Sequence, residues 1–220
     1  MKNIKAIIFD AYGTLFDVNS AAEKCKDKIG DKWEAFANYW RTTQLEYTWL
    51  RSLMKRHKDF WQVTEDSLDK SMKVFNIDNS MRNELLDLYK ILSPYFEVPE
   101  VLKSLKEKNY KLSILSNGTP SLLNELVKSN NLENLFDDIF SIEEVGIYKP
   151  DSRVYDMPIK KYKIQNDEVA FLSANTWDVS GGGNYGFNSI WVNRNNSIFD
   201  NLDYRPQYEV KSLKELINII

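Results

Sequence analysis

The chain has 220 residues, of which 43% are hydrophobic and 28% are charged, and its formal net charge is −3. These values predict a soluble globular protein that buries roughly 70% of the surface of its unfolded chain. Acidic and basic residues are interspersed, so we expect no nucleic-acid partner and no membrane-surface partner. Cys25 is the single cysteine, which excludes an internal disulfide and a thiolate metal cluster.

Neither a secretion signal nor a membrane anchor is expected. The N-terminal residues lead into an apolar run that extends only from Ala6 to Phe9, which is too short for the core of a signal peptide. No later segment approaches the roughly 20 apolar residues of a membrane span. We therefore expect a cytoplasmic protein.

Short apolar runs recur along the chain, and each is typical of a buried parallel strand. They lie at residues 5–9, 111–115, 138–141, 169–172 and 189–192. Between them, helical patterns are predicted at about 99–108, 120–130 and 151–162. Strands that alternate with helices predict the α/β class, with a doubly wound parallel sheet covered by helices on both faces.

Residues 17–95 interrupt this alternation. They contain no convincing strand and are predicted to form four helices, in the longest of which apolar residues follow the i, i+3, i+4, i+7 spacing. These apolar residues are Trp33, Phe36, Ala37 and Trp40. We therefore predict a core domain of residues 1–16 and 96–220, with a helical cap subdomain of residues 17–95 inserted after the first strand.

Polar segments stand beside the ends of the predicted strands. They are Asp10, Ser116-Asn117, Lys149-Pro150 and residues 173–178. In an open α/β sheet, ligands bind outside the carboxyl ends of the strands. The topology therefore predicts one crevice that holds all four segments, with the helical cap above it.

These segments resemble, in order, the motifs of the haloacid dehalogenase superfamily, and within it the L-2-haloacid dehalogenases. The residues that carry the resemblance are 9–17, 40–51, 115–118, 149–155 and 173–178. The resemblance covers nearly the whole chain. It implies a haloacid dehalogenase-like fold and hydrolysis of the carbon–halogen bond of a small 2-haloalkanoic acid.

Asp10 is the nucleophile that the resemblance implies. From its position alone, it could equally be a turn-forming aspartate at the end of a strand. In the role implied by the resemblance, its carboxylate attacks C2 of the substrate and displaces halide, which leaves an ester.

Two departures from the superfamily's phosphatases favour a dehalogenase. The phosphatases carry a second aspartate where this chain has Tyr12, and that aspartate protonates the leaving alcohol. A halide leaves as a stable anion and needs no proton. The phosphatases also carry an aspartate that helps to hold Mg²⁺ where this chain has Ala174. We therefore predict chemistry without a metal or another cofactor.

Arg41 shares a helix face with Ala37 and Leu45, which lie four residues away on either side. A charge in such a row is either a snorkelling side chain or an anion ligand. The resemblance implies that Arg41 draws off the departing halide, with Asn117 and Trp177 completing the binding site. A cation placed where charge develops in the transition state accelerates the reaction.

The resemblance gives further polar residues a role in catalysis. Ser116 and nearby backbone N–H groups would bind the substrate carboxylate, and Thr14 would stabilise the nucleophile loop. Lys149 would keep Asp10 ionised, and Asp178 would position or deprotonate the water that attacks the ester. Taken separately, these residues could serve as a turn, a helix cap, a surface lysine and a helix N-cap.

Hydrogen bonds from Tyr155, Ser173 and Asn175 are expected to orient Lys149. Apolar side chains are expected to enclose the alkyl group of the substrate, although core packing would explain each of them equally well. These residues are Ala11, Tyr12, Leu45, Phe60 and Trp177.

Two other features are predicted to have no catalytic role. His57 is the only histidine, and we expect it on the solvated face of a cap helix, which excludes a Ser-His-Asp triad. The glycines at 181–183 lack the Lys-Ser/Thr of a Walker loop, so we do not interpret them as a phosphate site.

The sequence thus predicts an (S)-2-haloacid dehalogenase that releases halide and an (R)-2-hydroxy acid. One alternative is a Mg²⁺-dependent phosphatase of the same fold, and another is a binding protein that has kept the fold without catalysis. The aromatic-rich cap could mediate a homodimer or could simply be packed internally.

Overall fold

The computed structural model describes residues 1 and 3–220. Over these residues the core is a six-stranded sheet with the order β3-β2-β1-β4-β5-β6, and all neighbouring strands are parallel. The strands are β1 (Ala6–Phe9), β2 (Lys111–Ser116), β3 (Asp138–Ser141), β4 (Val169–Ser173), β5 (Asn188–Val192) and β6 (Tyr208–Val210). The predicted fold class is confirmed.

Strand β1 lies at the centre of the sheet because its residues are apolar on both faces. Ala6 is paired with Lys111 of β2 on one side and with Val169 of β4 on the other. Every residue of β1 is fully buried, as expected for a strand covered by helices on both faces. The sequence did not predict β6, because this edge strand has only three residues, of which only Val210 is buried.

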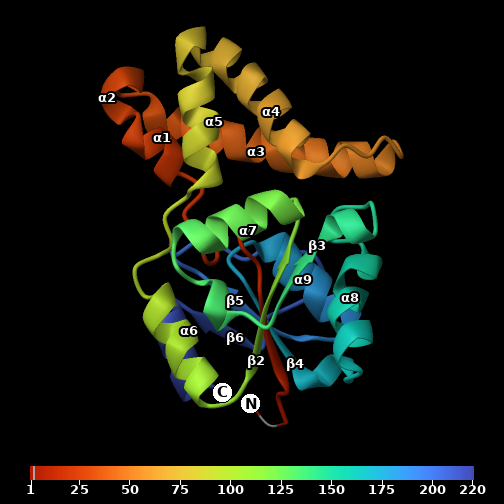
Figure 1. Cartoon of the computed structure of the whole chain (residues 1–220). Coiled ribbons are helices and arrows are strands. Elements are labelled where there is room, and N and C mark those ends of the chain that lie inside the picture. Colours follow the sequence, from red (N-terminus) through yellow and green to blue (C-terminus); the bar gives the residue numbers. More distant parts are fainter. Residues whose placement is uncertain (2) are drawn as a thin grey trace.

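Helices cover both faces of the sheet. Figure 1 shows α6 on one side of it and α8 and α9 on the other. The core helices are α6 (Val98–Glu107), α7 (Pro120–Ser129), α8 (Ser152–Tyr162) and α9 (Thr176–Tyr185), with 3-10 turns at η2 (Glu133–Leu135), η3 (Ile142–Glu144), η4 (Asn166–Glu168) and η5 (Leu213–Asn218). The Thr119 and Asp151 side chains cap the first turns of α7 and α8.

A group of helices packs at the carboxyl ends of the strands, at the top of Figure 1. They are α1 (Ser20–Lys24), α2 (Lys26–Ile29), α3 (Trp33–Leu53), α4 (Phe60–Phe75) and α5 (Arg82–Lys90), with the turn η1 (Asn79–Met81). The prediction of four helices was wrong, because α1 and α2 are separate helices that meet at Cys25 and are too short to show a helical period. Among the described residues, no helix has both the length and the apolar character needed to cross a membrane.

The chain enters and leaves this helical group through two paired linkers. The Asp17 N–H donates to the Ser93 carbonyl at 2.9 Å, and the Tyr95 N–H donates to the Leu15 carbonyl at 3.0 Å. The predicted boundaries after residues 16 and 95 both fall in this paired segment. That residues 17–95 act as a separate cap subdomain remains a prediction.

The opposite end of the helical group also contacts the core. The Tyr148 hydroxyl donates to the Lys58 carbonyl at 2.6 Å, and His57 Nε2 lies 2.9 Å from Glu143 Oε2. The prediction for His57 was wrong, because this residue lies in the loop between α3 and α4 and is partly buried against Tyr148. Glu143 and Tyr148, which contact His57, lie far from it in the sequence, so no local pattern predicts their contact.

Candidate active site

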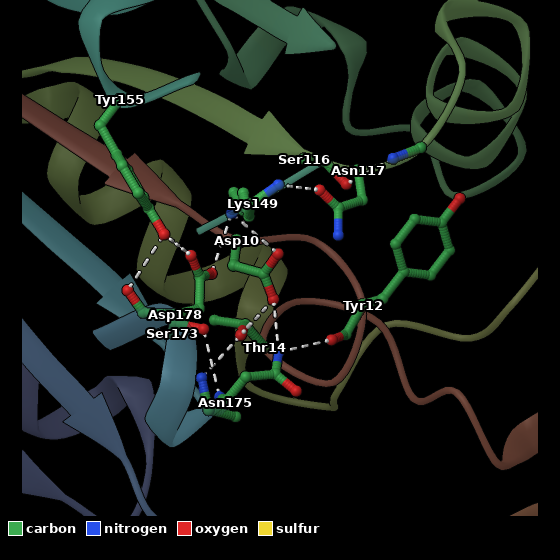
Figure 2. A network of polar contacts seen from close by, with 12 residues as sticks. Asp10, Tyr12, Thr14, Ser116, Asn117, Lys149, Tyr155, Ser173, Asn175 and Asp178 are labelled. Carbon is green, nitrogen blue, oxygen red and sulfur yellow. Dashed lines mark hydrogen bonds and ion pairs between the residues drawn. The ribbon is translucent and has the colours of Figure 1, made fainter. Parts of the chain in front are cut away.

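Asp10 directly follows the central strand β1, and its carboxylate is the most densely bonded group at the carboxyl end of the sheet (Figure 2). The Asp10 N–H donates to the Leu172 carbonyl at 2.9 Å, which continues the pairing with β4 and fixes the direction of the side chain. Only 5% of the residue is exposed. A carboxylate so nearly dry depends on its partners to stay charged.

Lys149 lies between two carboxylates. Its Nζ is 3.2 Å from Asp10 Oδ1 and 2.9 Å from Asp178 Oδ2, and it lies 5.1 Å from the centre of the Phe171 ring. The Lys149 side chain is completely buried. A buried ammonium is tolerated only when it is paired, so these three charged groups depend on one another.

Asp178 lies in the first turn of α9 and is fully buried. Burial raises its pKa to about 6, with a further increase from the neighbouring Asp10 charge, while Lys149 and the Tyr155 hydroxyl act in the opposite direction. Tyr155 donates to Asp178 Oδ1 at 2.8 Å. Burial also raises the pKa of Tyr155, so its hydroxyl remains a donor.

Two side chains hold the second oxygen of the Asp10 carboxylate. Thr14 Oγ1 donates to Asp10 Oδ2 at 3.1 Å, and Asn175 Nδ2 donates to the same atom at 2.9 Å. Thr14 Oγ1 also accepts the Ala174 N–H at 2.8 Å, and Ser173 Oγ accepts the Asn175 N–H at 3.1 Å. The loops after β1 and β4 therefore fix the Asp10 carboxylate jointly.

The loop after β2 approaches the same site. Asn117 Oδ1 accepts the backbone N–H of Lys149 at 3.1 Å, so it orients the segment that carries the lysine. Ser116 Oγ accepts the Gly118 N–H at 3.1 Å, which leaves the hydroxyl hydrogen available to a ligand. A Cβ on Gly118 would lie 2.9 Å from the Tyr12 ring, so this position requires glycine.

Arg41 reaches the site from α3. Its NH1 group donates to Gln44 Oε1 at 2.8 Å, and its NH2 group donates to the Tyr12 carbonyl at 3.4 Å. Gln44 is held in turn by Thr64 at 2.7 Å and by Tyr89 at 3.0 Å. No role was predicted for Gln44. The signal in the sequence was its place three residues after Arg41, which puts both side chains on one helix face.

The predicted apolar residues are only partly brought together. The Tyr12 ring centre lies 5.1 Å from that of Phe60, and Trp177 meets Trp49 edge-on at 5.4 Å. Ala11 is buried, and its carbonyl accepts backbone N–H groups of the nucleophile loop. Leu45 is half-buried on α3, with no described bond to the polar residues of the site.

A cleft of about 330 Å³ lies between the helical group and the core. Its lining includes the predicted residues Tyr12, Arg41, Asn175 and Trp177, whereas Asp10, Lys149 and Asp178 lie outside this lining. The lining also includes residues for which no role was predicted, among them Asn38, Tyr95, Trp191, Arg194 and Asn195. Leu45 and Phe60 lie outside this lining.

The glycines at 181–183 serve helix packing. A Cβ on Gly181 would lie 2.4 Å from the Tyr155 hydroxyl, and one on Gly182 would lie 2.6 Å from the Phe171 ring. Helix α9 can therefore approach the sheet closely enough to place Asp178 beside Lys149. Among the described residues, no group of three or more His, Cys, Asp or Glu is placed to hold a metal ion.

A parallel α/β core with an aspartate at the end of its central strand, a buried lysine beside it and a helical insertion above defines a class of hydrolases. The family model of haloacid dehalogenase-like hydrolases matches residues 4–186. The chain belongs to this family, which confirms the resemblance inferred from the sequence.

Several relatives match along their whole length. An (S)-2-haloacid dehalogenase of Pseudomonas putida is 39% identical over 220 residues, which are 99% of this chain and 97% of the relative. A dehalogenase crystal structure has a TM-score of 0.98 at 36% identity and covers 100% of this chain and 98% of its own. An L-2-haloacid dehalogenase from Xanthobacter autotrophicus with chloropropionic acid covalently bound has a TM-score of 0.91 at 31% identity, with 98% of each chain covered.

Proposed function

We propose that this chain is an (S)-2-haloacid dehalogenase that hydrolyses small 2-haloalkanoic acids through an aspartyl ester. The observation that carries the proposal is the Asp10–Lys149–Asp178 array, in which one buried ammonium contacts both carboxylates. The relatives named (S)-2-haloacid dehalogenase, which match over nearly the full length of this chain, support the choice of substrate.

In the first step, an oxygen of the Asp10 carboxylate attacks C2 of the substrate. The new C2–O bond forms as the carbon–halogen bond breaks, and halide leaves with the bonding electrons. Attack occurs opposite the leaving group and inverts the centre. Thr14, Lys149 and Asn175 fix the direction in which the Asp10 carboxylate meets C2. The bound substrate and the carboxylate therefore react as in a unimolecular step between oriented groups.

The departing halide requires a positive or hydrogen-bonding site. Arg41 is suited to this role because it lines the cleft and is steadied by Gln44. Asn117 and Trp177 are the proposed remaining halide contacts. Ser116 is proposed to bind the substrate carboxylate with its hydroxyl and the neighbouring backbone N–H groups, and Ala11, Tyr12, Leu45 and Phe60 are proposed as the apolar surroundings of the alkyl group.

In the second step, water attacks the carbonyl carbon of the Asp10 ester. Asp178 takes a proton from this water, and when the acyl–oxygen bond breaks the protonated Asp178 gives this proton to the alkoxide oxygen, which releases the (R)-2-hydroxy acid. The remaining carboxyl proton on Asp10 passes to solvent, which restores both carboxylates. The raised pKa of Asp178, to about 6, makes it a better proton acceptor than an ordinary carboxylate. Lys149 offsets the negative charge of the tetrahedral intermediate.

The proposal extends to the organisation of the molecule. Residues 17–95 are proposed to act as a cap over the core of residues 1–16 and 96–220, in a cytoplasmic enzyme that needs no metal or other cofactor. The proposed partners are the 2-haloacid and halide, with no nucleic acid or membrane, and with a possible homodimer formed through the cap.

The test is halide release from the (S) and (R) enantiomers of 2-chloropropionate, with EDTA present throughout. We expect release from the (S) enantiomer alone and none above background from Asp10→Asn, because the amide is not nucleophilic. Asp87→Asn, which changes an exposed carboxylate, serves as the matched control. In a single turnover in H₂¹⁸O, the label should enter Asp10 and not the product.

Other outcomes would contradict the proposal. Activity retained in Asp10→Asn would exclude the covalent mechanism. Hydrolysis of an aryl phosphate that EDTA abolishes, without halide release, would indicate a phosphatase of the same fold.

A further inference from the structure

Arg194 follows β5, at the same carboxyl end of the sheet as Asp10, and it lines the cleft. Its side chain is only 12% exposed, and that of its partner Glu97 is only 5% exposed. The mechanism proposed above makes no use of this buried ion pair. An ion pair removed from water to this extent carries a desolvation cost, which further contacts of Arg194 must help to offset.

The Arg194 guanidinium contacts three residues in two segments of the chain. Its NH2 group donates to the Thr14 carbonyl at 2.8 Å, and its NH1 group donates to Glu97 Oε1 at 2.6 Å. The guanidinium also lies 3.8 Å from the centre of the Tyr95 ring, on which it stacks. One side chain thus joins the nucleophile loop to the linker through which the chain returns from the helical group.

Thr14 connects this contact to the reacting carboxylate. The Thr14 hydroxyl donates to Asp10 Oδ2 at 3.1 Å, while the Thr14 carbonyl accepts from Arg194. The outgoing linker is bound to the same unit, because the Leu15 carbonyl accepts the Tyr95 N–H at 3.0 Å. A displacement of Tyr95 would therefore pull on Leu15 and its neighbour Thr14. Arg194 opposes this displacement because it binds Tyr95 and the Thr14 carbonyl at the same time.

We propose that Arg194 is a positioning residue that fixes the nucleophile loop through the Thr14 carbonyl and locks this loop to the linker through which the chain returns from the helical group. This inference rests on the proposed dehalogenase reaction. Arg194 does not touch the reacting atoms in this role. It holds the direction of the Asp10 carboxylate through Thr14.

Two substitutions separate the contacts of Arg194. Arg194→Met keeps an apolar stem of similar length but removes every donor. Arg194→Lys keeps the charge for Glu97 but provides a single donor centre, which cannot reproduce the planar fork that reaches Thr14 and Glu97 together. Arg205 gives matched control variants, since it also lies near an aromatic ring, Phe199, and is exposed on the surface.

The experiment measures halide release from (S)-2-chloropropionate in steady state and in single turnover with enzyme in excess. For Arg194→Met we expect a loss of about tenfold or more in kcat and in the single-turnover rate, because small misplacement of a reacting group is costly. KM should stay within about twofold, since no substrate contact is removed, and Arg194→Lys should recover part of the rate. Arg205→Met and Arg205→Lys should match the wild type.

Thermal unfolding of each variant separates positioning from stability. A rate loss in protein that is fully folded at the assay temperature supports the inference. A loss that follows the unfolded fraction, a rise in KM alone, or a normal rate in folded Arg194→Met would overturn it. If Arg194→Met does not fold, the same criteria apply to Arg194→Lys. A wild type that releases no halide would overturn the proposed function itself, whereas an active wild type with unaffected variants would overturn only the role of Arg194.

Discussion

Lys149 contacts both Asp10 and Asp178 from a completely buried position, so no charge in this array can be changed alone. The arrangement suits a reaction in which one carboxylate is a nucleophile and the other handles a proton. Burial and the neighbouring Asp10 charge raise the pKa of Asp178, which suits this carboxylate to proton transfer.

Replacement of Lys149 by Met would leave two buried carboxylates without their cation. We expect halide release to fall by at least about a hundredfold, since the electrostatic support of both steps is lost. We also expect a loss of about 3–5 kcal/mol in the free energy of unfolding, the usual cost of breaking a buried pair. Denaturant titration and halide assays measure the two effects.

Lys160→Met is the control for this substitution, because Lys160 pairs with Asp156 while remaining largely exposed. It should leave both quantities nearly unchanged. A Lys149→Met variant that is as stable and active as the control would show that the buried pair matters little.

The pH dependence provides a second residue-scale prediction. Asp178 must be ionised to accept a proton, so kcat should rise as the pH increases through about 6, the raised pKa of this group. The Tyr155 hydroxyl hydrogen bond favours the ionised form. Tyr155→Phe should therefore raise this pKa further and move the acid limb of the kcat profile to higher pH.

Tyr185→Phe is the matched control, because it keeps the ring that packs against Tyr155 and removes only a hydroxyl that donates to Asp156 at 2.8 Å. Its pH profile should coincide with that of the wild type. An acid limb in Tyr155→Phe that stays in place, or moves to lower pH, would contradict the assignment of this limb to Asp178.

At the scale of elements, α9 carries Asp178 to the site only because its glycines let it lie close to its neighbours. In Gly181→Ala, the new Cβ would lie 2.4 Å from the Tyr155 hydroxyl and 2.7 Å from the Pro150 Cβ. We expect a loss of about 1–3 kcal/mol in the free energy of unfolding from overpacking, although alanine favours helix more than glycine. Activity should fall as Tyr155 is displaced.

Asn184→Ala on the exposed side of the same helix tests the helix propensity alone. This variant should be neutral or slightly stabilised in thermal unfolding. If Gly181→Ala were stabilised to the same degree, the close approach of α9 would have no energetic consequence.

At the scale of the whole molecule, the helical group contacts the core at both of its ends and, between them, through Arg41 and Trp49. The paired linkers lie at one end, and the contacts of Tyr148 and Glu143 with the α3–α4 loop lie at the other. The cleft with Arg41 lies between the helical group and the core. The linkers are covalently continuous with the core, whereas the α3–α4 loop is held only by non-covalent contacts, so we expect opening to begin at this loop.

Tyr148→Phe removes the hydrogen bond to the Lys58 carbonyl and should weaken this contact by about 1 kcal/mol. Amide hydrogen exchange of residues 54–59 should then be about fivefold faster, while exchange of the central strand β1 stays unchanged. Tyr47→Phe on α3, whose hydroxyl makes no hydrogen bond to the described residues, should leave both rates unchanged. Equal exchange in the two variants would argue against a contact that limits opening.

The sequence alone determined the fold class, five of the strands and the core helices α6, α7 and α8, because apolar periodicity and capping residues act over short distances. It did not predict α9, whose three consecutive glycines are poor helix formers. It also indicated which loops carry polar side chains. It did not predict the edge strand β6 or the division between α1 and α2, because such short elements show no period.

Only the tertiary structure decided which groups meet. His57 was expected in solvent, but Glu143 and Tyr148 approach it from a distant part of the chain. Gln44, Arg194 and Tyr95 are ordinary in sequence, and their relation to Arg41 or Thr14 exists only in space. The pKa of Asp178 likewise depends on burial and on charges brought together by folding, and no local pattern contains this information.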